Sequence, residues 1–369
     1  MKKLRVGVVG LGMGRHHVEG FNAHPDAEVV AVCDPDEIRL KAVGDRHNVP
    51  GRYATASEMF GAERLDICSV ATPNKFHKPL AVQAFERGCH VFCEKPMATS
   101  AREGRAMIDA AQKAGKFLMI NFSYRFTEAA VALKSQVDAG AIGEIYFART
   151  VWHRRRGLPG FGGWFGQKEL AGGGPLIDLG VHRLDLALWL MGYPRPVWVL
   201  GSTYSHIAEA LVKKSGQKYD VEDMAVGMVK FDNGATLEIE ASWAANIAER
   251  ELMETRLFGT SGGLVHRNLD ESYSFEAEIF VEHEGAHFDM KLHPPLPACD
   301  TEYCSFVEVI LGRREPIATG EEGLVVMELL DAIYKSARTG KPVHLKPPYT
   351  ESRASGGQRS RRRRGGEPL

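Results

Sequence analysis

The residues best suited to chemistry are a carboxylate and an imidazole four positions apart, Asp178 and His182. They follow three consecutive glycines at 172–174, which would let the backbone approach a ligand closely. Helical spacing of the residues from 179 to 189 predicts a helix, which places both side chains on neighbouring turns of one face. Such a pair could orient a small substrate and move its proton. A buried structural ion pair is the alternative interpretation.

A second charged pair, Glu94 and Lys95, precedes Pro96 and follows a predicted strand over residues 90–93. Packing gives no reason for a glutamate and a lysine at the tip of a buried strand. Ligands of doubly wound sheets bind beyond the carboxyl ends of the strands, so we interpret this pair as part of a site.

The preceding predicted strand, residues 65–71, also ends in a polar loop. By the same rule this loop would lie at the ligand-binding edge of the sheet. Its candidate binding residues are Thr72, Asn74 and His77. Ordinary loop capping is the alternative interpretation of Asn74 and His77.

The N-terminal segment carries a nucleotide-binding pattern, because an apolar run at residues 4–9 leads directly into a glycine-rich turn. Strand, turn and helix form the context in which G-x-G-x-x-G places a pyrophosphate at a helix N-terminus. The candidate cofactor-binding residues of the turn are Gly10, Gly12, Met13 and Gly14. The third glycine position falls on Arg15, so either the turn is reshaped or Arg15 reaches a cofactor phosphate.

A second predicted strand, residues 28–33, ends in Asp34, about twenty residues beyond the glycines, as the dinucleotide pattern expects. Its carboxylate would accept a hydrogen bond from a ribose 2′-hydroxyl and repel a 2′-phosphate. The cofactor expected from this residue is therefore NAD, with NADP less favoured. A turn or helix-capping role is the alternative for Asp34.

Composition excludes several classes of protein. The 369 residues are 44% hydrophobic and 25% charged, with a net charge of −1, as in ordinary globular proteins. We therefore expect no nucleic-acid partner, and no apolar run reaches membrane-spanning length, so we expect no membrane partner. The six cysteines show no zinc-binding pattern, and we predict no metal site. Reduced thiols without an export signal favour the cytoplasm.

Strands and helices alternate through the first 120 or so residues, which predicts a doubly wound parallel sheet. The pattern then changes to longer, alternating strands, and Asp232-Asn233-Gly234 between two of them predicts a β-hairpin. From residue 346 the chain is rich in Pro, Gly, Ser and Arg without apolar periodicity, which predicts disorder.

These motifs together resemble the glucose–fructose oxidoreductase/inositol dehydrogenase/MocA (Gfo/Idh/MocA) family over residues 4–345. The resemblance is carried by A-T-P-N at 71–74 with His77, E-K-P at 94–96, G-G-G-x-x-x-D-x-x-x-H at 172–182, and a hairpin ending in Ser242-Trp243. It implies an α/β protein with a Rossmann NAD(P)-binding domain at 1–122. An α+β domain at 123–345, with a large, mainly antiparallel open sheet, would bind substrate and form a homodimer or homotetramer. A disordered basic tail, 346–369, would follow.

Matched residue by residue, the resemblance places Lys95, Asp178 and His182 at the catalytic positions. His182 would act as the base, Lys95 would stabilise the developing oxyanion, and Asp178 would hold a substrate hydroxyl or orient the other two. All three would also contact the substrate. Glu94 would lie on the cofactor side, and the 74–77 loop would contact the ribose and the nicotinamide.

Three arginines at 154–156 and Trp164 precede the glycines. A solvated run of charge is the usual explanation of such a cluster. The functional alternative is a substrate loop, in which Trp164 forms a flat wall for a sugar ring and an arginine, with Arg155 as the candidate, binds an anionic substituent.

The leading functional hypothesis is an NAD(P)-dependent dehydrogenase or reductase acting on a secondary alcohol or ketone of a sugar, sugar derivative or inositol. A second class is an NAD-dependent glycosidase that acts by transient oxidation and elimination. A third is a non-catalytic, ligand-sensing regulator. The intact set of Lys95, Asp178 and His182 disfavours the regulator but does not separate the two enzymes.

Overall fold

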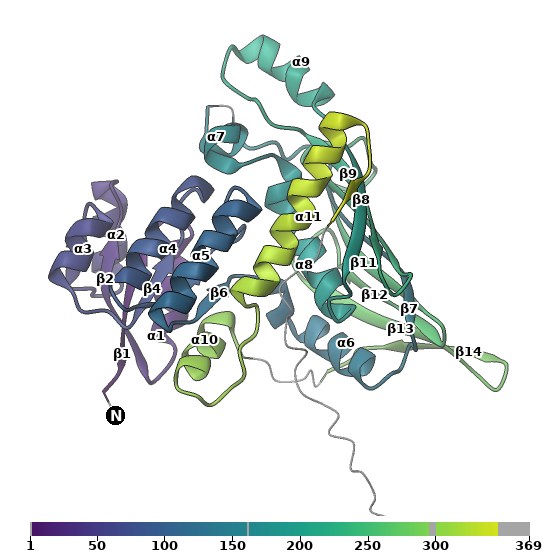
Figure 1. The fold of residues 1–369 in the computed structure, drawn as a ribbon, viewed down its shortest axis with the longest axis horizontal. Coiled ribbons are helices and arrows are strands. Elements are labelled where there is room, and N and C mark those ends of the chain that lie inside the picture. Colours follow the sequence, from purple (N-terminus) through teal and green to yellow (C-terminus); the bar gives the residue numbers. More distant parts are fainter. Residues whose placement is uncertain (1, 161, 295–299, 346–369) are drawn as a thin grey trace, which may run out of the picture.

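The computed structural model describes residues 2–160, 162–294 and 300–345, so the predicted tail at 346–369 lies outside the described residues. The described chain forms two sheets with helices packed around and between them (Figure 1). None of the helices in these ranges combines the length and apolarity that a membrane span needs.

The first sheet has six parallel strands in the order β3-β2-β1-β4-β5-β6. The strands are β1 (Leu4–Val9), β2 (Ala27–Cys33), β3 (Gly51–Tyr53), β4 (Ile67–Val70), β5 (His90–Cys93) and β6 (Leu118–Ile120). The connecting helices are α1 (Gly14–Asn22), α2 (Glu37–Arg46), α3 (Ala56–Ala62), α4 (His77–Glu86) and α5 (Ala101–Ala114). β4 is buried along its whole length, because helices cover both faces of such a sheet. The strand order is that of a Rossmann fold, as expected.

The second sheet has nine strands in the order β14-β13-β12-β11-β7-β10-β9-β8-β15, and only β7 and β10 pair in parallel within it. The strands are β7 (Ile145–Arg154), β8 (Pro196–Tyr204), β9 (Met224–Phe231), β10 (Thr236–Ser242), β11 (Glu251–Gly259), β12 (Gly262–Asn268), β13 (Phe275–His283), β14 (Ala286–Lys291) and β15 (Val343–His344). The predicted hairpin is β9–β10. The mainly antiparallel sheet is confirmed.

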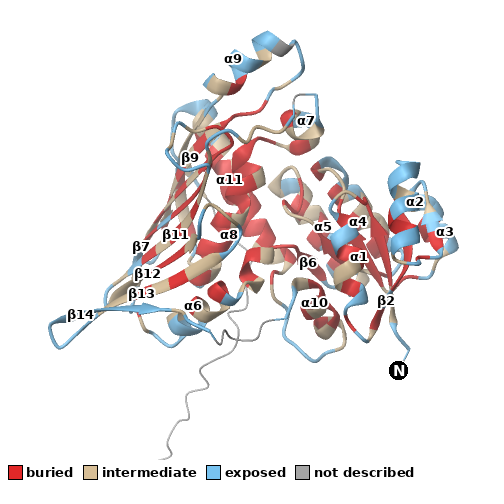
Figure 2. Cartoon of the chain, turned by 180° about the vertical axis from the view of Figure 1, so that it is seen from behind, coloured by how far each residue is buried: buried red, intermediate tan, exposed pale blue. Residues whose placement is uncertain are grey.

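One face of this sheet is covered by helices. Leu237, Ile239 and Ala241 of β10 are buried on that face, as their period of two predicts. The helices of this region are α6 (Glu128–Asp138), α7 (Lys168–Ala171), α8 (Val181–Leu190), α9 (His206–Ser215) and α11 (Gly320–Thr339). Figure 2 shows α8 and much of α11 buried, whereas α9 and β14 are largely exposed.

The two C-terminal helices, assigned to the second domain from the sequence, both contact the first domain. α10 (Glu302–Ile310) lies beside α1 in the first domain (Figure 1), where Tyr303 packs on His17 with ring centres 5.2 Å apart. α11 runs between the two sheets and packs on both α5 and β8 (Figure 1). The apolar faces of these helices need cover, and the first domain supplies part of it.

Candidate active site

The glycine turn after β1 leaves room for a ligand. Gly10 has φ +86°, and a Cβ there would lie 2.6 Å from the carbonyl oxygen of Ala71, so only glycine fits. A Cβ at Gly12 would meet no other group within 4 Å, so this position faces open space. The first glycine therefore shapes the turn, and the second offers close backbone approach to a pyrophosphate.

The departure at Arg15 is explained by a reshaped turn. A Cβ at Gly14 would lie 2.9 Å from Val8 Cγ1, so Gly14 already provides the close helix–strand packing of the pattern's third glycine. Arg15 donates to the carbonyl oxygen of Gly12 at 2.7 Å. Met13, which precedes α1, is exposed beside the turn.

Asp34 lies at the end of β2 and is only 4% exposed. Its Oδ2 accepts from the backbone N–H of Leu11 at 2.7 Å, and its Oδ1 accepts from that of Asp36 at 2.9 Å. Arg39 approaches Oδ2 at 3.3 Å. The carboxylate is therefore fixed against the glycine turn, as the ribose-binding hypothesis requires.

Thr72 supplies an unsatisfied polar atom at the same place. Its Oγ1 is buried and has no hydrogen-bond partner among the described residues. A Cβ on Gly10 would lie 2.9 Å from Thr72 Cγ2, so the two loops are adjacent. Buried hydroxyls are normally paired, and a cofactor hydroxyl or phosphate would satisfy this one. The residues at this edge of the first sheet thus fit a dinucleotide.

Asn74 and His77 are placed differently from expectation. The carboxamide of Asn74 donates to the carbonyl oxygen of Ala171 at 2.7 Å. The ring nitrogens of His77 lie 2.8 Å from the carbonyl oxygens of Pro96 and Thr72, and the ring is fully buried. These contacts correspond to the loop-support alternative. His77 thus supports the loop, and a contact of His77 with the cofactor stays a prediction.

Glu94 anchors a buried network that includes a residue not selected from the sequence. His17 of α1 lies 2.9 Å from Glu94 Oε1 and 2.7 Å from the hydroxyl of Ser69. Asn121 donates to Glu94 Oε1 at 2.7 Å, and the backbone N–H of Lys95 donates to Glu94 Oε2 at 3.2 Å. The network holds Lys95 relative to the glycine-turn helix. The four-residue spacing of His17 from Phe21 was a signal that it faces the core.

Lys95 and Asp178 join the two domains. Lys95 Nζ donates to both the carboxylate Oδ1 and the main-chain oxygen of Asp178, at 2.9 Å in each case. Trp243 Nε1 donates to Asp178 Oδ2 at 3.0 Å. Asp178 lies in a π-helical turn, η4 (Leu176–Gly180), and makes no hydrogen bond to His182. The pairing of carboxylate and imidazole expected from their spacing is therefore replaced by a carboxylate–ammonium pair.

His182, at the start of α8, is partly buried between two aromatic rings. Its ring centre lies 5.0 Å from that of Tyr124 and 5.7 Å from that of Trp152. Burial lowers the pKa of His182 well below its ordinary value, and the positive charges of Lys95, Arg183 and Arg154 lower it further. The imidazole is consequently neutral at neutral pH, and its protonated form is disfavoured.

Of the arginines at 154–156, Arg154 is the one whose charge acts on His182. Side chains alternate along a strand, so Arg154 shares a face of β7 with Trp152, and Arg155 does not. Arg154 donates from Nε to Glu251 at 2.8 Å and from Nη2 to the hydroxyl of Tyr273 at 2.8 Å. Arg155 is exposed, and its guanidinium donates to the carbonyl oxygen of Ala248 at 3.3 Å. Arg154 is thus a second candidate for the substrate-binding arginine, and the choice of Arg155 stays a prediction.

Trp164 reaches the site through a second ring. In η3 (Trp164–Gly166) its ring stacks on Phe165 with centres 3.8 Å apart. Phe165 in turn meets Trp243 edge-on at 6.5 Å, and Trp243 holds Asp178. Trp164 therefore belongs to an aromatic wall beside Asp178, and its contact with substrate stays a prediction.

Comparison with known proteins identifies the family. A model described as an oxidoreductase family with an NAD-binding Rossmann fold matches residues 4–122, and a model of the GFO/IDH/MocA C-terminal domain matches residues 130–265. The D-glucoside 3-dehydrogenase of Escherichia coli strain K12 is 35% identical over 355 residues, covering 93% of this chain and 97% of that protein. The chain belongs to the Gfo/Idh/MocA family. It is an oxidoreductase with an NAD-binding Rossmann domain.

Other members of the Gfo/Idh/MocA family match along the same length. The scyllo-inositol 2-dehydrogenase (NAD(+)) of Bacillus subtilis strain 168 is 26% identical, covering 93% of this chain and 96% of that protein. The crystal structure of aldose-aldose oxidoreductase from Caulobacter crescentus, complexed with glycerol, has 28% identity and a TM-score of 0.79, covering 93% of this chain and 100% of that one. A levoglucosan dehydrogenase complex with NADH and levoglucosan has 25% identity and a TM-score of 0.82, covering 93% and 99%.

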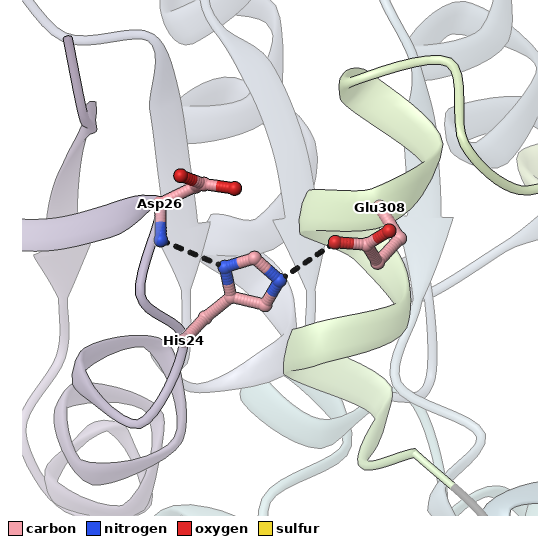
Figure 3. Close-up of side chains that lie close together, drawn as sticks. All are labelled: His24, Asp26 and Glu308. Carbon is pink, nitrogen blue, oxygen red and sulfur yellow. Dashed lines mark hydrogen bonds and ion pairs between the residues drawn. The ribbon is translucent and has the colours of Figure 1, made fainter. Parts of the chain in front are cut away.

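A cluster of possible metal ligands lies away from this site. His24, Asp26 and Glu308 come together where α10 meets the first domain (Figure 3). His24 Nε2 lies 2.9 Å from Glu308 Oε1. Arg313 donates to Asp26 at 2.7 Å and to Glu308 at 3.1 Å, so an internal cation already serves both carboxylates. We interpret the cluster as a structural clamp on α10.

Proposed function

We propose that this Gfo/Idh/MocA oxidoreductase is an NAD-dependent dehydrogenase or reductase acting on a secondary alcohol or ketone of a sugar, sugar derivative or inositol. The observation that carries the proposal is the joining of Lys95, from the cofactor-binding domain, to Asp178, from the second domain. This contact places an ammonium and a carboxylate beside the neutral imidazole of His182, where the loops of both domains meet. The names of the relatives, among them a D-glucoside 3-dehydrogenase, support the substrate class.

When bound, NAD supplies a nicotinamide ring that accepts or donates the hydride. The chain's own residues manage the oxygen of the reacting carbon. Lys95 supplies positive charge to the alkoxide that develops as hydride leaves, because its ammonium lies in a partly buried site. His182 and Asp178 orient the substrate hydroxyls, and Arg154 with Trp164 would border the sugar ring.

We propose that the protein is cytoplasmic and forms a homodimer or a homotetramer. Two observations support this proposal. The five cysteines in the described residues are all free, which suits a reducing compartment. Leu200 and Phe258 are 41% and 37% exposed on the second sheet, where a partner copy would cover them.

The test is a panel of glucosides, other sugars and inositols, each assayed with NAD⁺ and NADP⁺ while reduced cofactor and released aglycone are both followed. The proposal expects stoichiometric cofactor reduction without aglycone release. Aglycone release without net reduction would instead identify a redox-assisted glycosidase. Binding of sugars without either reaction would identify a sensor.

A further inference from the structure

Among the described residues of the second domain, two arginines are completely buried, Arg125 and Arg183. Arg125 pairs with Asp185 at 2.5 Å and with Glu322 at 2.8 Å. Arg183 directly follows His182, and no carboxylate lies within ion-pair distance of it in the described part of the chain. A buried cation without a carboxylate partner is unfavourable, so its presence next to a site histidine indicates a role other than stabilising the fold.

The guanidinium of Arg183 is held in an aromatic cage. Its Cζ lies 4.5 Å from the ring centre of Tyr124, 5.2 Å from Phe275 and 5.5 Å from Trp152. The faces of these rings attract a cation and offset part of its lost hydration. Nη1 faces His266 Nδ1 at 3.3 Å, whereas Nε has no hydrogen-bond partner among the described residues. The cage holds a full positive charge in place without neutralising it.

His182 shares two walls of this cage, Tyr124 and Trp152. A second proton on its imidazole would therefore place two positive charges close together in a poorly hydrated region. Burial, followed by the charges of Lys95, Arg183 and Arg154, lowers the pKa of His182 well below its ordinary value. The groups facing His182 thus come from four elements, namely Lys95 after β5, Tyr124 in η2 (Ser123–Phe126), Arg154 on β7 and Arg183 on α8.

The two nitrogens of His182 are not equivalent. Nδ1 is buried and has no hydrogen-bond partner among the described residues, and Nε2 is not among the buried unpaired atoms. A proton on Nδ1 would bury an unsatisfied N–H donor, and such donors are rarer in proteins than unsatisfied acceptors. We therefore expect the neutral ring to carry its single proton on Nε2.

We propose that Arg183 is a positioning residue that keeps His182 neutral with its proton on Nε2, so that His182 donates a hydrogen bond to the substrate oxygen and does not take its proton. This inference rests on the proposed function and assigns the proton to Lys95. In ketone reduction the carbonyl carbon accepts hydride, the Lys95 ammonium gives one N–H proton to the oxygen, and Lys95 then takes a proton from water; alcohol oxidation reverses these steps. This replaces the role of base that the family resemblance implies for His182.

The test uses the full chain labelled with ¹⁵N-histidine, with His182→Asn to assign the His182 signals. In the wild type, NMR should show Nε2 protonated and Nδ1 unprotonated across the pH range in which an ordinary histidine titrates, near pH 6.5. Arg183→Met removes the charge and keeps an unbranched apolar chain. In this variant, protonation of His182 and the acidic limb of the kcat/KM profile should both move up by about one pH unit. Arg183→Lys, which keeps the charge, should leave the limb where it is in the wild type.

Arg125→Met is the matched structural control. It leaves Asp185 buried without its cation and should lower the melting temperature, whereas Arg183→Met removes a cation that has no carboxylate partner and should not. If Arg183 served packing alone, Arg183→Met would have a lower melting temperature than the wild type and an unchanged pH profile of kcat/KM.

Protonated Nδ1 in the wild type, or unchanged titration of His182 in Arg183→Met, would overturn the inference. If Arg183→Met does not fold, the NMR measurement of the His182 tautomer in the wild type still tests the inference. If no sugar in the panel is turned over, the NMR titration still tests Arg183 and His182, and only the proposed function fails.

Discussion

One ammonium group, Lys95 Nζ, makes two hydrogen bonds to Asp178, to its carboxylate and to its backbone oxygen, at 2.9 Å in each case. Lys95 follows a strand of the first sheet, and Asp178 lies against the second. The proposed catalytic set is consequently complete only when the two domains are docked. Trp243 fixes the other carboxylate oxygen at 3.0 Å, so Asp178 holds Lys95 in a defined position.

We expect Lys95→Ala and His182→Ala each to lower kcat by at least about a hundredfold, because they remove a charge and a donor at the developing oxyanion. NADH binding, measured by fluorescence titration, should persist, since neither side chain is proposed to hold the cofactor on its own. Wild-type turnover by both variants would mean that other residues carry the chemistry.

The two neighbouring arginines should differ sharply. Arg154→Ala should lower kcat/KM by at least about tenfold, because Arg154 lies on the inner face of β7 near His182. Arg155→Ala should stay close to wild type, since that side chain is exposed. Steady-state kinetics on the best substrate of the panel compare the two variants. Equal losses of kcat/KM would show that the side of β7 on which an arginine lies does not determine whether it binds substrate.

Cofactor preference should depend on Asp34. The wild type should have the higher kcat/KM with NAD(H), because the fixed carboxylate repels a 2′-phosphate. Asp34→Asn keeps the shape and removes the charge, leaving Arg39, 3.3 Å from Asp34 Oδ2, free to meet a phosphate. The ratio of kcat/KM for NAD(H) to that for NADP(H) should fall by about tenfold. An unchanged ratio would place Asp34 away from the ribose.

His90 should make stability sensitive to acid. Burial lowers its pKa to about 4, and the charge of Lys116 lowers it further, against an opposing effect of Asp66. The folded state therefore binds fewer protons than the unfolded state, whose histidines titrate near pH 6.5. Stability should fall as pH decreases from about 6.5 to about 4 and be unaffected by His90 above that window. Between these pH values the urea unfolding midpoint of His90→Gln should fall less steeply with decreasing pH than that of the wild type. Parallel plots of midpoint against pH would contradict this prediction.

Oligomerisation should depend on the open face of the second sheet. Leu200→Glu combined with Phe258→Glu should convert the protein to monomers, because both side chains are exposed and apolar and a charge would oppose their burial. Light scattering at micromolar concentration gives the mass of each form. A wild-type protein that is monomeric at this concentration would contradict the proposed homodimer or homotetramer.

The sequence alone predicted the Rossmann domain, the β9–β10 hairpin, and Lys95, Asp178 and His182 as candidate residues of one site. These features depend on local periodicity, turn chemistry and motifs, which neighbouring residues specify. Tertiary structure decided which groups touch. A π-helical turn and docking of the domains pair Asp178 with Lys95 rather than with His182. Alternation along β7 places Arg154 on the face of Trp152, and burial and nearby positive charges lower the pKa of His182, because the environment of one side chain depends on strands far apart in the chain.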